Sequence, residues 1–266
     1  MKILFSDFDG TLVENDKVLS QKNKEMMKIL QKQGHLMVIC TGRNIKELQR
    51  DQEIFDFPFD YLVLNNGGHI VDKNYHTLYE KVIDKQVGID ILNHTTSYPH
   101  MWSYFCDGKE TYAYKDGITY DHSIGDVEID ADFISLYHQA HHFQIICFNQ
   151  DDAGMKDTNI CYDYVKNNYH DDVEAYFNLH YVDVVPSGCS KGTGVHKLLE
   201  LLSQNITEVY AVGDSYNDLS MIQEATYGYT FCYAHQDIKQ ATDRHVQYVY
   251  EVIEDMLGGK YDDLAR

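Results

Sequence analysis

Proline, tryptophan and positive charge are scarce in this sequence of 266 residues. It contains three Pro and one Trp, and its 22 Lys and Arg stand against 42 Asp and Glu, which gives a formal net charge of −20 at pH 7. Because surfaces that bind nucleic acid are basic, this balance argues against a nucleic-acid partner. It would also repel anionic substrates at long range, so any phosphate site must supply positive potential locally.

Long apolar runs are absent as well. No segment approaches the roughly 18 uncharged apolar residues of a membrane span, and the N-terminus enters a strand-like run almost at once instead of a signal sequence. We therefore expect a cytoplasmic protein without a membrane partner. The six Cys are scattered and form no C-x-x-C pair, and their mostly apolar surroundings favour buried thiols over zinc ligands or disulfides.

Strand and helix patterns alternate near both ends of the chain. Apolar runs of strand length are each followed by a polar loop and then by a segment with apolar residues at helical spacing. Such alternation predicts an α/β fold with a Rossmann-like, doubly wound parallel sheet. The expected strands span 2–6, 35–40, 61–64 and 208–212, and the expected helices span 45–55, 193–202 and the stretch between Ser20 and Gly34.

The pattern changes in the middle of the chain, where strand-like segments are rich in Tyr and other aromatic residues. We expect a separate α+β cap domain at 85–185, inserted between core segments 1–84 and 186–266. No internal repeat, low-complexity tract or Pro-rich linker interrupts the sequence. The expected elements of the insert are strands at 102–106, 111–114, 143–148 and 181–185 and helices at 131–140 and 162–168.

Two carboxylates follow the first apolar run directly. Asp7 and Asp9 are separated by one residue, with Gly10 behind them, so a buried strand opens here into a tight loop. Open α/β sheets carry their active sites at this end of the strands. Paired carboxylates repel each other unless a cation or a shared proton compensates them, and Mg²⁺ is a natural partner. On its own, the motif could also be an ordinary Asp-Gly turn.

Four positions in the outer segments each follow a strand or open a helix. Taken singly, Thr41 could be a helix cap and Lys191 a solvated charge. Asp214 and Asp218 could be an i,i+4 pair in a capped loop. Together the four positions supply a nucleophile, a proton donor, metal ligands, a hydroxyl donor and a cation, as phosphoryl transfer requires. They are Asp7 with Asp9, Thr41, Lys191 and the loop 213–218.

Five short motifs carry a family resemblance. They are Asp7-Phe8-Asp9-Gly10-Thr11-Leu12, Thr41-Gly42-Arg43, Asn66-Gly67, Ser190-Lys191-Gly192 and Gly213-Asp214-Ser215-Tyr216-Asn217-Asp218. With these motifs the sequence resembles the haloacid dehalogenase-like hydrolase superfamily, and within it the Cof-type phosphatases with a large inserted cap. It departs from the family pattern at Gly68, where members carry Ala, and at 231–236, where members carry a small-residue loop with Asn.

The resemblance implies a phosphatase that hydrolyses a small phosphomonoester, such as a sugar phosphate or another phosphorylated metabolite. Asp7 would attack phosphorus and form an aspartyl-phosphate. Asp9 would protonate the leaving oxygen and then take a proton from water. Mg²⁺ would be the cofactor, held by Asp7, the main-chain carbonyl of Asp9 and Asp214.

The resemblance also assigns the remaining motif residues. Asp218 is expected to orient Lys191 or a metal-bound water, and Arg43 to reach the leaving group from the core. Asn66 and Gly67 are expected either to support the site residues or to contact the substrate. The groups expected to bind phosphate oxygens are the Thr41 hydroxyl, the Lys191 ammonium, the backbone N–H groups of Phe8 and Gly42, and Asn217.

Three other functions stay open from the sequence. A phosphomutase would form the same aspartyl-phosphate but return the phosphoryl group to a second sugar hydroxyl. A phosphorylatable signalling receiver also places acidic residues, a Thr and a Lys around Mg²⁺, although receivers are shorter and have no insertion. A non-catalytic sugar-phosphate binder would keep the fold but should lack part of the constellation. The expected assembly is a monomer or a small homo-oligomer.

Overall fold

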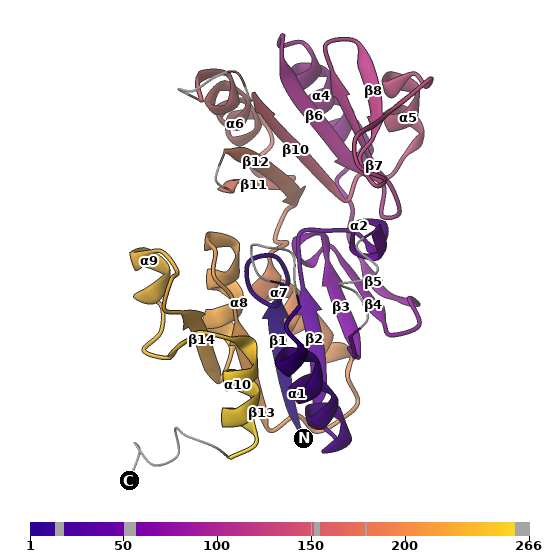
Figure 1. Cartoon of the computed structure of the whole chain (residues 1–266). Coiled ribbons are helices and arrows are strands. Elements are labelled where there is room, and N and C mark those ends of the chain that lie inside the picture. Colours follow the sequence, from indigo (N-terminus) through magenta and orange to yellow (C-terminus); the bar gives the residue numbers. More distant parts are fainter. Residues whose placement is uncertain (14–18, 51–56, 150, 152–154, 179, 259–266) are drawn as a thin grey trace. The chain divides into compact units, whose positions relative to one another are not determined.

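The computed structural model describes residues 1–13, 19–50, 57–149, 151, 155–178 and 180–258 and consists of two compact units (Figure 1). The first unit comprises Met1–Gly42, Gln52–Tyr79 and Ser190–Arg266, and the second comprises Arg43–Asp51 and Glu80–Cys189. The segment that begins at Arg43 thus belongs to the second unit, whereas the sequence places it in the first core segment. The expected cap boundaries, 85 and 185, stay a prediction.

An eight-stranded sheet forms the first unit, with the strand order β15-β14-β13-β1-β2-β3-β4-β5. β1 (Lys2–Asp7) lies between β13 (Glu208–Val212) and β2 (Leu36–Cys40) and is parallel to both. This central position explains its nearly continuous apolar sequence, because both faces of the strand are covered. The other strands are β3 (Tyr61–Leu64), β4 (His69–Asp72), β5 (Thr77–Glu80), β14 (Tyr227–Phe231) and β15 (His245–Val246).

Helices flank this sheet. Ile3 and Phe5 of β1 share a core cluster with Val195 and Leu198 of α7, so the intervening Leu4, also fully buried, points to the opposite face. The strands from β15 through β3 are parallel, and β4 pairs antiparallel with β3. Because the sheet is mainly parallel and is flanked by helices, the predicted α/β fold is confirmed. The helices of this unit are α1 (Gln21–Lys32), α7 (Lys191–Leu201), α8 (Leu219–Glu224), α9 (Gln236–Lys239) and α10 (Val249–Met256).

The start of α1 follows its sequence signal closely. Ser20 is the N-cap, and its hydroxyl oxygen accepts a hydrogen bond from the backbone N–H of Asn23 at 3.2 Å. Met27 and Leu30 form the buried stripe of the helix. The chain leaves the helix through Gly34, whose φ of 78° is readily available to glycine. The expected cap, apolar spacing and stop signal are all confirmed.

The second unit has its own seven-stranded sheet, in the order β11-β12-β10-β6-β7-β8-β9 with antiparallel neighbours. Its strands are β6 (Met101–Cys106), β7 (Thr111–Lys115), β8 (Ile118–Asp121), β9 (Val127–Ile129), β10 (Gln144–Asn149), β11 (Val173–Asn178) and β12 (Tyr181–Pro186). Its helices are α2 (Ile45–Arg50), α4 (Lys85–Thr96), α5 (Phe133–Gln139) and α6 (Lys156–Asn168).

Two helices differ from the sequence-based expectation. α2 confirms the first half of the helix expected at 45–55, and residues 51–55 lie outside the described part of the chain. α4 is not among the helices predicted from the sequence, although Asp84 caps it by accepting hydrogen bonds from the N–H groups of Gln86 and Val87.

Among the described residues, no helix combines the length and the apolar character that crossing a bilayer requires.

The core of the second unit contains a buried histidine. His142 has no exposed surface, and its Nε2 donates a hydrogen bond to the carbonyl oxygen of Tyr137 at 2.8 Å. Its Nδ1 has no partner among the described residues. Burial lowers the pKa of this imidazole, because the charged form would lose its hydration. His142 is therefore neutral in the folded protein at neutral pH.

This burial predicts a pH-dependent part of the stability. An unfolded histidine titrates near 6.5, so protons bind the unfolded chain in preference as the pH falls below about 6.5, and the free energy of unfolding decreases. Gln does not titrate, so His142→Gln lacks this pH dependence. The free energy of unfolding of the wild type should therefore exceed that of the variant by less at pH 5 than at pH 7.5. Chemical denaturation at several pH values measures it. A gap that stays constant over that range contradicts the prediction.

Candidate active site

The site is built around the end of β1. Asp7 is the last residue of the strand, and the residue is 5% exposed. The chain then turns sharply, with the N–H of Gly10 donating to the carbonyl of Val13 at 2.8 Å and the N–H of Val13 donating to that of Phe8 at 2.9 Å. Phe8 is buried under this turn, whereas the side chain of Asp9 is exposed. The turn therefore gives the two carboxylates different environments.

Gly10 is required by this turn for two reasons. Its φ is 78°, which strains any other L-residue. A Cβ at this position would also lie 2.9 Å from Oδ2 of Asp214. Asp214 follows β13, the parallel neighbour of β1, and its Oδ1 accepts a hydrogen bond from the Thr11 hydroxyl at 2.8 Å. The turn after β1 and the loop after β13 are thus held side by side.

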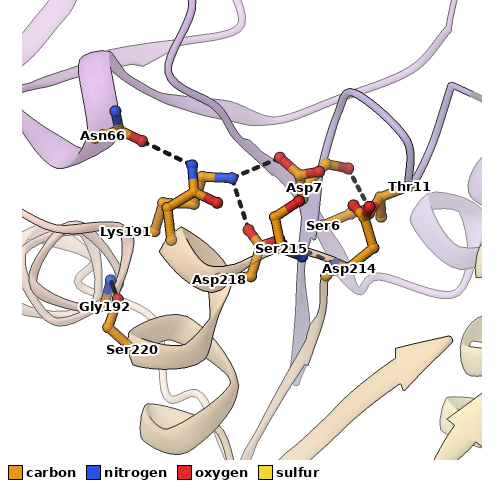
Figure 2. A network of polar contacts seen from close by, with 12 residues as sticks. Ser6, Asp7, Thr11, Asn66, Lys191, Gly192, Asp214, Ser215, Asp218 and Ser220 are labelled. Carbon is orange, nitrogen blue, oxygen red and sulfur yellow. Dashed lines mark hydrogen bonds and ion pairs between the residues drawn. The ribbon is translucent and has the colours of Figure 1, made fainter. Parts of the chain in front are cut away.

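Lys191 lies between two carboxylates (Figure 2). It is the first residue of α7, behind the N-cap Ser190, and only 2% of it is exposed. Its Nζ is 2.6 Å from Oδ1 of Asp7 and 2.6 Å from Oδ1 of Asp218. A buried ammonium needs such partners, because the loss of its hydration would otherwise cost several kcal/mol. Lys191 is thereby fixed beside Asp7 in the core of the first unit.

Both oxygens of Asp218 already have donors. Oδ1 accepts from Lys191, and Oδ2 accepts from the backbone N–H groups of Asp214 at 3.0 Å and Ser215 at 2.9 Å. These bonds close the loop that contains the short 3₁₀ helix η2 (Tyr216–Asp218). Asp218 thus contacts Lys191 and shapes the loop, and the orienting role that the resemblance implies for it stays a prediction.

The charges of this cluster are not balanced within the protein. Burial raises the pKa of Asp7 well above its usual range, and the charges of Asp218 and Asp214 raise it further, while Lys191 acts in the opposite direction. Burial also raises the pKa of Asp214, against the hydrogen bond from Thr11. For Lys191, burial opposes the charged form, but Asp218 and Asp7 outweigh it and raise the pKa of the ammonium. The site therefore has room for further positive charge.

The donor set fits a hard divalent cation. Asp7, Asp214 and Asp218 each offer a carboxylate oxygen, and these oxygens lie within 4.8 Å of one another. Magnesium prefers oxygen ligands and binds through one or two carboxylates together with water and phosphate oxygens. Since the oxygens of Asp218 are occupied by Lys191 and backbone donors, Asp7 and Asp214 are the better candidates for direct ligands.

A second group of polar residues lies at the ends of β2 and β3. Thr41 directly follows β2 and is 1% exposed, and its N–H donates to the carbonyl of Val63 at 2.9 Å. Its own carbonyl accepts from the N–H of Asn66 at 3.1 Å. The Asn66 Oδ1 accepts from Nδ2 of Asn217 at 3.3 Å, while the buried Nδ2 of Asn66 has no partner among the described residues. This amide can donate to an anion.

The structure brings most of the expected residues of the first unit together. Asp7, Lys191, Asp214 and Asp218 form one cluster. Asn217 extends from the same loop as Asp214 to Asn66, and Asn66 is bonded to Thr41. Gly67 packs against the carbonyl of Ser190, where a Cβ would lie 2.2 Å from the oxygen.

Arg43 is not part of the first unit. It belongs to the second unit, and its Nη1 is 3.4 Å from the carbonyl oxygen of Glu47. The sequence instead places Arg43 on the core. Its proposed contact with the leaving group stays a prediction.

Two residues of the site were given no role from the sequence. Thr11 belongs to the first motif, and its hydroxyl holds Asp214. Tyr233 is 56% exposed, and its hydroxyl donates to the carbonyl of Gly10 at 2.6 Å. Its position soon after β14, next to β13 in the sheet, is the signal that could have found it. Tyr233 therefore supports the turn that carries Asp9.

The whole chain is similar in sequence to known proteins. Residues 4–251 match the family model of the haloacid dehalogenase-like hydrolases. The chain is 24% identical over 253 residues to 5-amino-6-(5-phospho-D-ribitylamino)uracil phosphatase YwtE of Bacillus subtilis (strain 168), with 85% of each chain covered. It is 26% identical over 272 residues to phosphatase YwpJ of the same organism, with 91% of this chain and 93% of the relative covered.

A solved structure agrees in fold. It is a haloacid dehalogenase-like hydrolase from B. subtilis with 23% identity and a TM-score of 0.77, and the match covers 98% of this chain and 100% of the other. The family resemblance and the fold class expected from the sequence are confirmed. The expected enzyme class is also confirmed, because the family is one of hydrolases and both relatives are named as phosphatases. The chain belongs to the haloacid dehalogenase-like hydrolases.

Proposed function

We propose that this enzyme is a Mg²⁺-dependent phosphatase that hydrolyses small phosphomonoesters through an aspartyl-phosphate on Asp7. The observation that carries the proposal is the cluster of buried Asp7, Lys191 and Asp218 with half-buried Asp214 near the ends of β1 and β13. A carboxylate nucleophile, a fixed cation and further oxygen ligands within a few ångströms are what phosphoryl transfer to a carboxylate needs.

Asp7 is the proposed nucleophile. Its position at the end of a fully packed strand fixes its main chain, and Lys191 fixes one of its oxygens at 2.6 Å. Such preorganisation lowers the barrier, because the attacking group needs no rearrangement to reach phosphorus. Attack forms an Asp7 O–P bond and breaks the bond between phosphorus and the leaving oxygen. A later attack of water on phosphorus releases inorganic phosphate and restores the carboxylate.

Asp9 is the proposed acid and base. In the acid form it gives its proton to the leaving oxygen, and as the carboxylate it then takes a proton from the attacking water. Its exposed side chain, one residue beyond buried Phe8, supports this role, because a group that exchanges protons with water must reach it. The bond from Tyr233 to the carbonyl of Gly10 would keep this turn in place during both steps.

Phosphate oxygens are the proposed ligands of the donors around Asp7. The Thr41 hydroxyl, the Lys191 ammonium and Asn217 are side-chain candidates, and Phe8 and Gly42 offer backbone N–H groups. Nδ2 of Asn66, for which the described part of the chain offers no partner, adds a further candidate. Donors fixed by the fold stabilise the charge that spreads over the equatorial oxygens in the transition state. They also supply the local attraction that an anionic substrate needs against the long-range repulsion expected from the net charge of −20.

Magnesium is the proposed cofactor. Asp7, Asp214 and the main-chain carbonyl of Asp9 would hold it, and when bound it would supply positive charge to the carboxylates and to the phosphoryl group. The raised pKa values of Asp7 and Asp214, which are due first to burial, support this assignment, because a cation beside these carboxylates would compensate the charge that burial disfavours. Asp218 would keep Lys191 in place instead of binding the metal directly.

The proposed substrate is a small phosphorylated metabolite, such as a sugar phosphate. The relative YwtE is named for a phosphate ester of a ribitylaminouracil, so phosphate esters that carry a pyrimidine belong in the same panel of substrates.

We expect release of inorganic phosphate from at least one ester of this panel with Mg²⁺, and none with excess chelator. Equal rates with and without chelator would contradict the metal requirement, and an isomerised sugar phosphate without free phosphate would indicate a mutase.

The Asp7→Asn variant tests the nucleophile. An amide cannot attack phosphorus and ligates Mg²⁺ poorly, so turnover should fall by at least about 10³-fold. The control is Asp72→Asn, which changes a carboxylate at the end of β4 in the same unit and should leave turnover near the wild-type rate. If Asp7→Asn keeps more than about a few per cent of the rate, Asp7 is not the attacking group.

The Asp9→Asn variant tests the proton donor. An aryl phosphate has a good leaving group that needs little protonation, so its first step should be slowed far less than that of an alkyl phosphate. Hydrolysis of the aspartyl-phosphate still needs the base, so the aryl ester should give a burst of phenol followed by a slow phase. Rapid mixing with an aryl and a sugar phosphate measures both effects. Equal slowing of the two esters without a burst would move the acid and base role to another group.

A further inference from the structure

The division between the two units falls inside the motif Thr41-Gly42-Arg43. The first unit ends here at Gly42, and the second begins at Arg43. Thr41 is held in the first unit by its hydrogen bonds to Val63 and Asn66. The residues that follow it within α2 belong instead to the unit that contains the inserted sheet. Gly42, whose N–H is a proposed phosphate donor, is therefore the residue at which the chain leaves the first unit.

Asn44 makes the buried connection on the second side. It has no exposed surface, and its Nδ2 donates to the Thr111 hydroxyl oxygen at 2.8 Å and approaches Sγ of Cys106 at 3.5 Å. Thr111 and Cys106, at 4% and 5% exposure, belong to the paired strands β7 and β6. A buried amide with a short bond to a strand residue is expensive to displace, because it would leave polar groups unpaired.

The same residue also starts α2. Oδ1 of Asn44 accepts from the N–H of Glu47 at 2.9 Å, and Oε2 of Glu47 accepts from the N–H of Asn44 at 3.0 Å. This reciprocal pair is a capping box, which fixes the direction in which the helix begins. One side chain thus sets the start of α2 and ties it to β7.

Two exposed contacts add to this connection. Lys46 pairs with Glu110, the residue before β7, and Nη1 of Arg50 donates to the carbonyl of His122 at 2.9 Å. Exposed ion pairs contribute little, because water and salt screen them. The buried bond between Asn44 and Thr111 is therefore the main tie between α2 and the sheet of the second unit.

We infer that Asn44 is a positioning residue of the phosphatase reaction. Thr41 is bonded within the first unit and Asn44 within the second, and only Gly42 and Arg43 lie between them along the chain. By holding Asn44, the bond to Thr111 restricts the backbone conformations open to the adjacent Arg43 and Gly42. This inference rests on the proposed function, because it assigns those two residues to phosphate and substrate.

Two variants remove the tie from its two ends. Asn44→Ser keeps a good N-cap oxygen for α2 but is too short to reach Thr111. Thr111→Val keeps the shape and strand preference of the side chain and removes the accepting oxygen. Each should lower kcat/KM for a phosphomonoester about tenfold, the effect of one buried hydrogen bond. The double variant should be no worse than either single variant, because both delete the same interaction.

The matched control is Ser123→Ala. The Ser123 hydroxyl accepts from the N–H of Thr111 at 2.6 Å, so its loss disturbs the same strand without touching Asn44. We expect this control to lower the free energy of unfolding but to leave kcat/KM and the inhibition by inorganic phosphate unchanged. Asn44→Ser and Thr111→Val should weaken that inhibition. If Asn44→Ser stays within about twofold of the wild-type kcat/KM, or changes it no more than Ser123→Ala does, the inference is wrong.

Hydrogen exchange separates this inference from the proposed function. The amides of Gly42 and Arg43 should exchange about tenfold faster in Asn44→Ser than in wild type, and at the wild-type rate in Ser123→Ala. This readout needs no turnover. A wild-type enzyme that releases no phosphate would refute the proposed function, while unchanged exchange at Gly42 and Arg43 in Asn44→Ser would refute the positioning role.

Discussion

The site depends on one buried ammonium group. Lys191 is 2% exposed and is held by Asp7 and Asp218, each at 2.6 Å. Removing one partner of such a buried pair costs roughly 3–5 kcal/mol, because the other charge is left without compensation. The strand that ends at Asp7, the helix that begins at Lys191 and the loop that contains Asp218 are therefore tied together by the same charges that would perform the chemistry.

The sheet topology explains how distant residues reach this point. β1 and β13 are adjacent parallel strands, so Asp7 and the loop that follows β13 meet at one edge of the sheet. Lys191, which is 184 positions after Asp7 in the sequence, contacts Asp7 there. α7 begins at the same edge, where its N-terminus favours an anion. Three carboxylates around one ammonium leave an excess of negative charge, which is consistent with a site completed by a divalent cation.

The sequence predicts those features that have local signals. Ser20 and Gly34 delimit α1, and the apolar run before Asp7 identifies the central strand with its carboxylate. What it does not predict depends on contacts between distant segments. The assignment of Arg43 to the second unit and the bond of Asn44 to Thr111 follow from packing that no short motif encodes. Roles for Thr11 and Tyr233 need the geometry of the turn they support.

The central claim is that phosphoryl transfer passes through Asp7, and direct detection of the covalent intermediate tests it. Asp9→Asn should accumulate the aspartyl-phosphate, because formation with an aryl phosphate continues while its hydrolysis is slowed. After an acid quench, peptide mass spectrometry should find one phosphoryl group on Asp7, and none when Asp7→Asn is combined with Asp9→Asn. Turnover without any phosphorylated Asp7, or a phosphoryl group on another residue, would contradict the account.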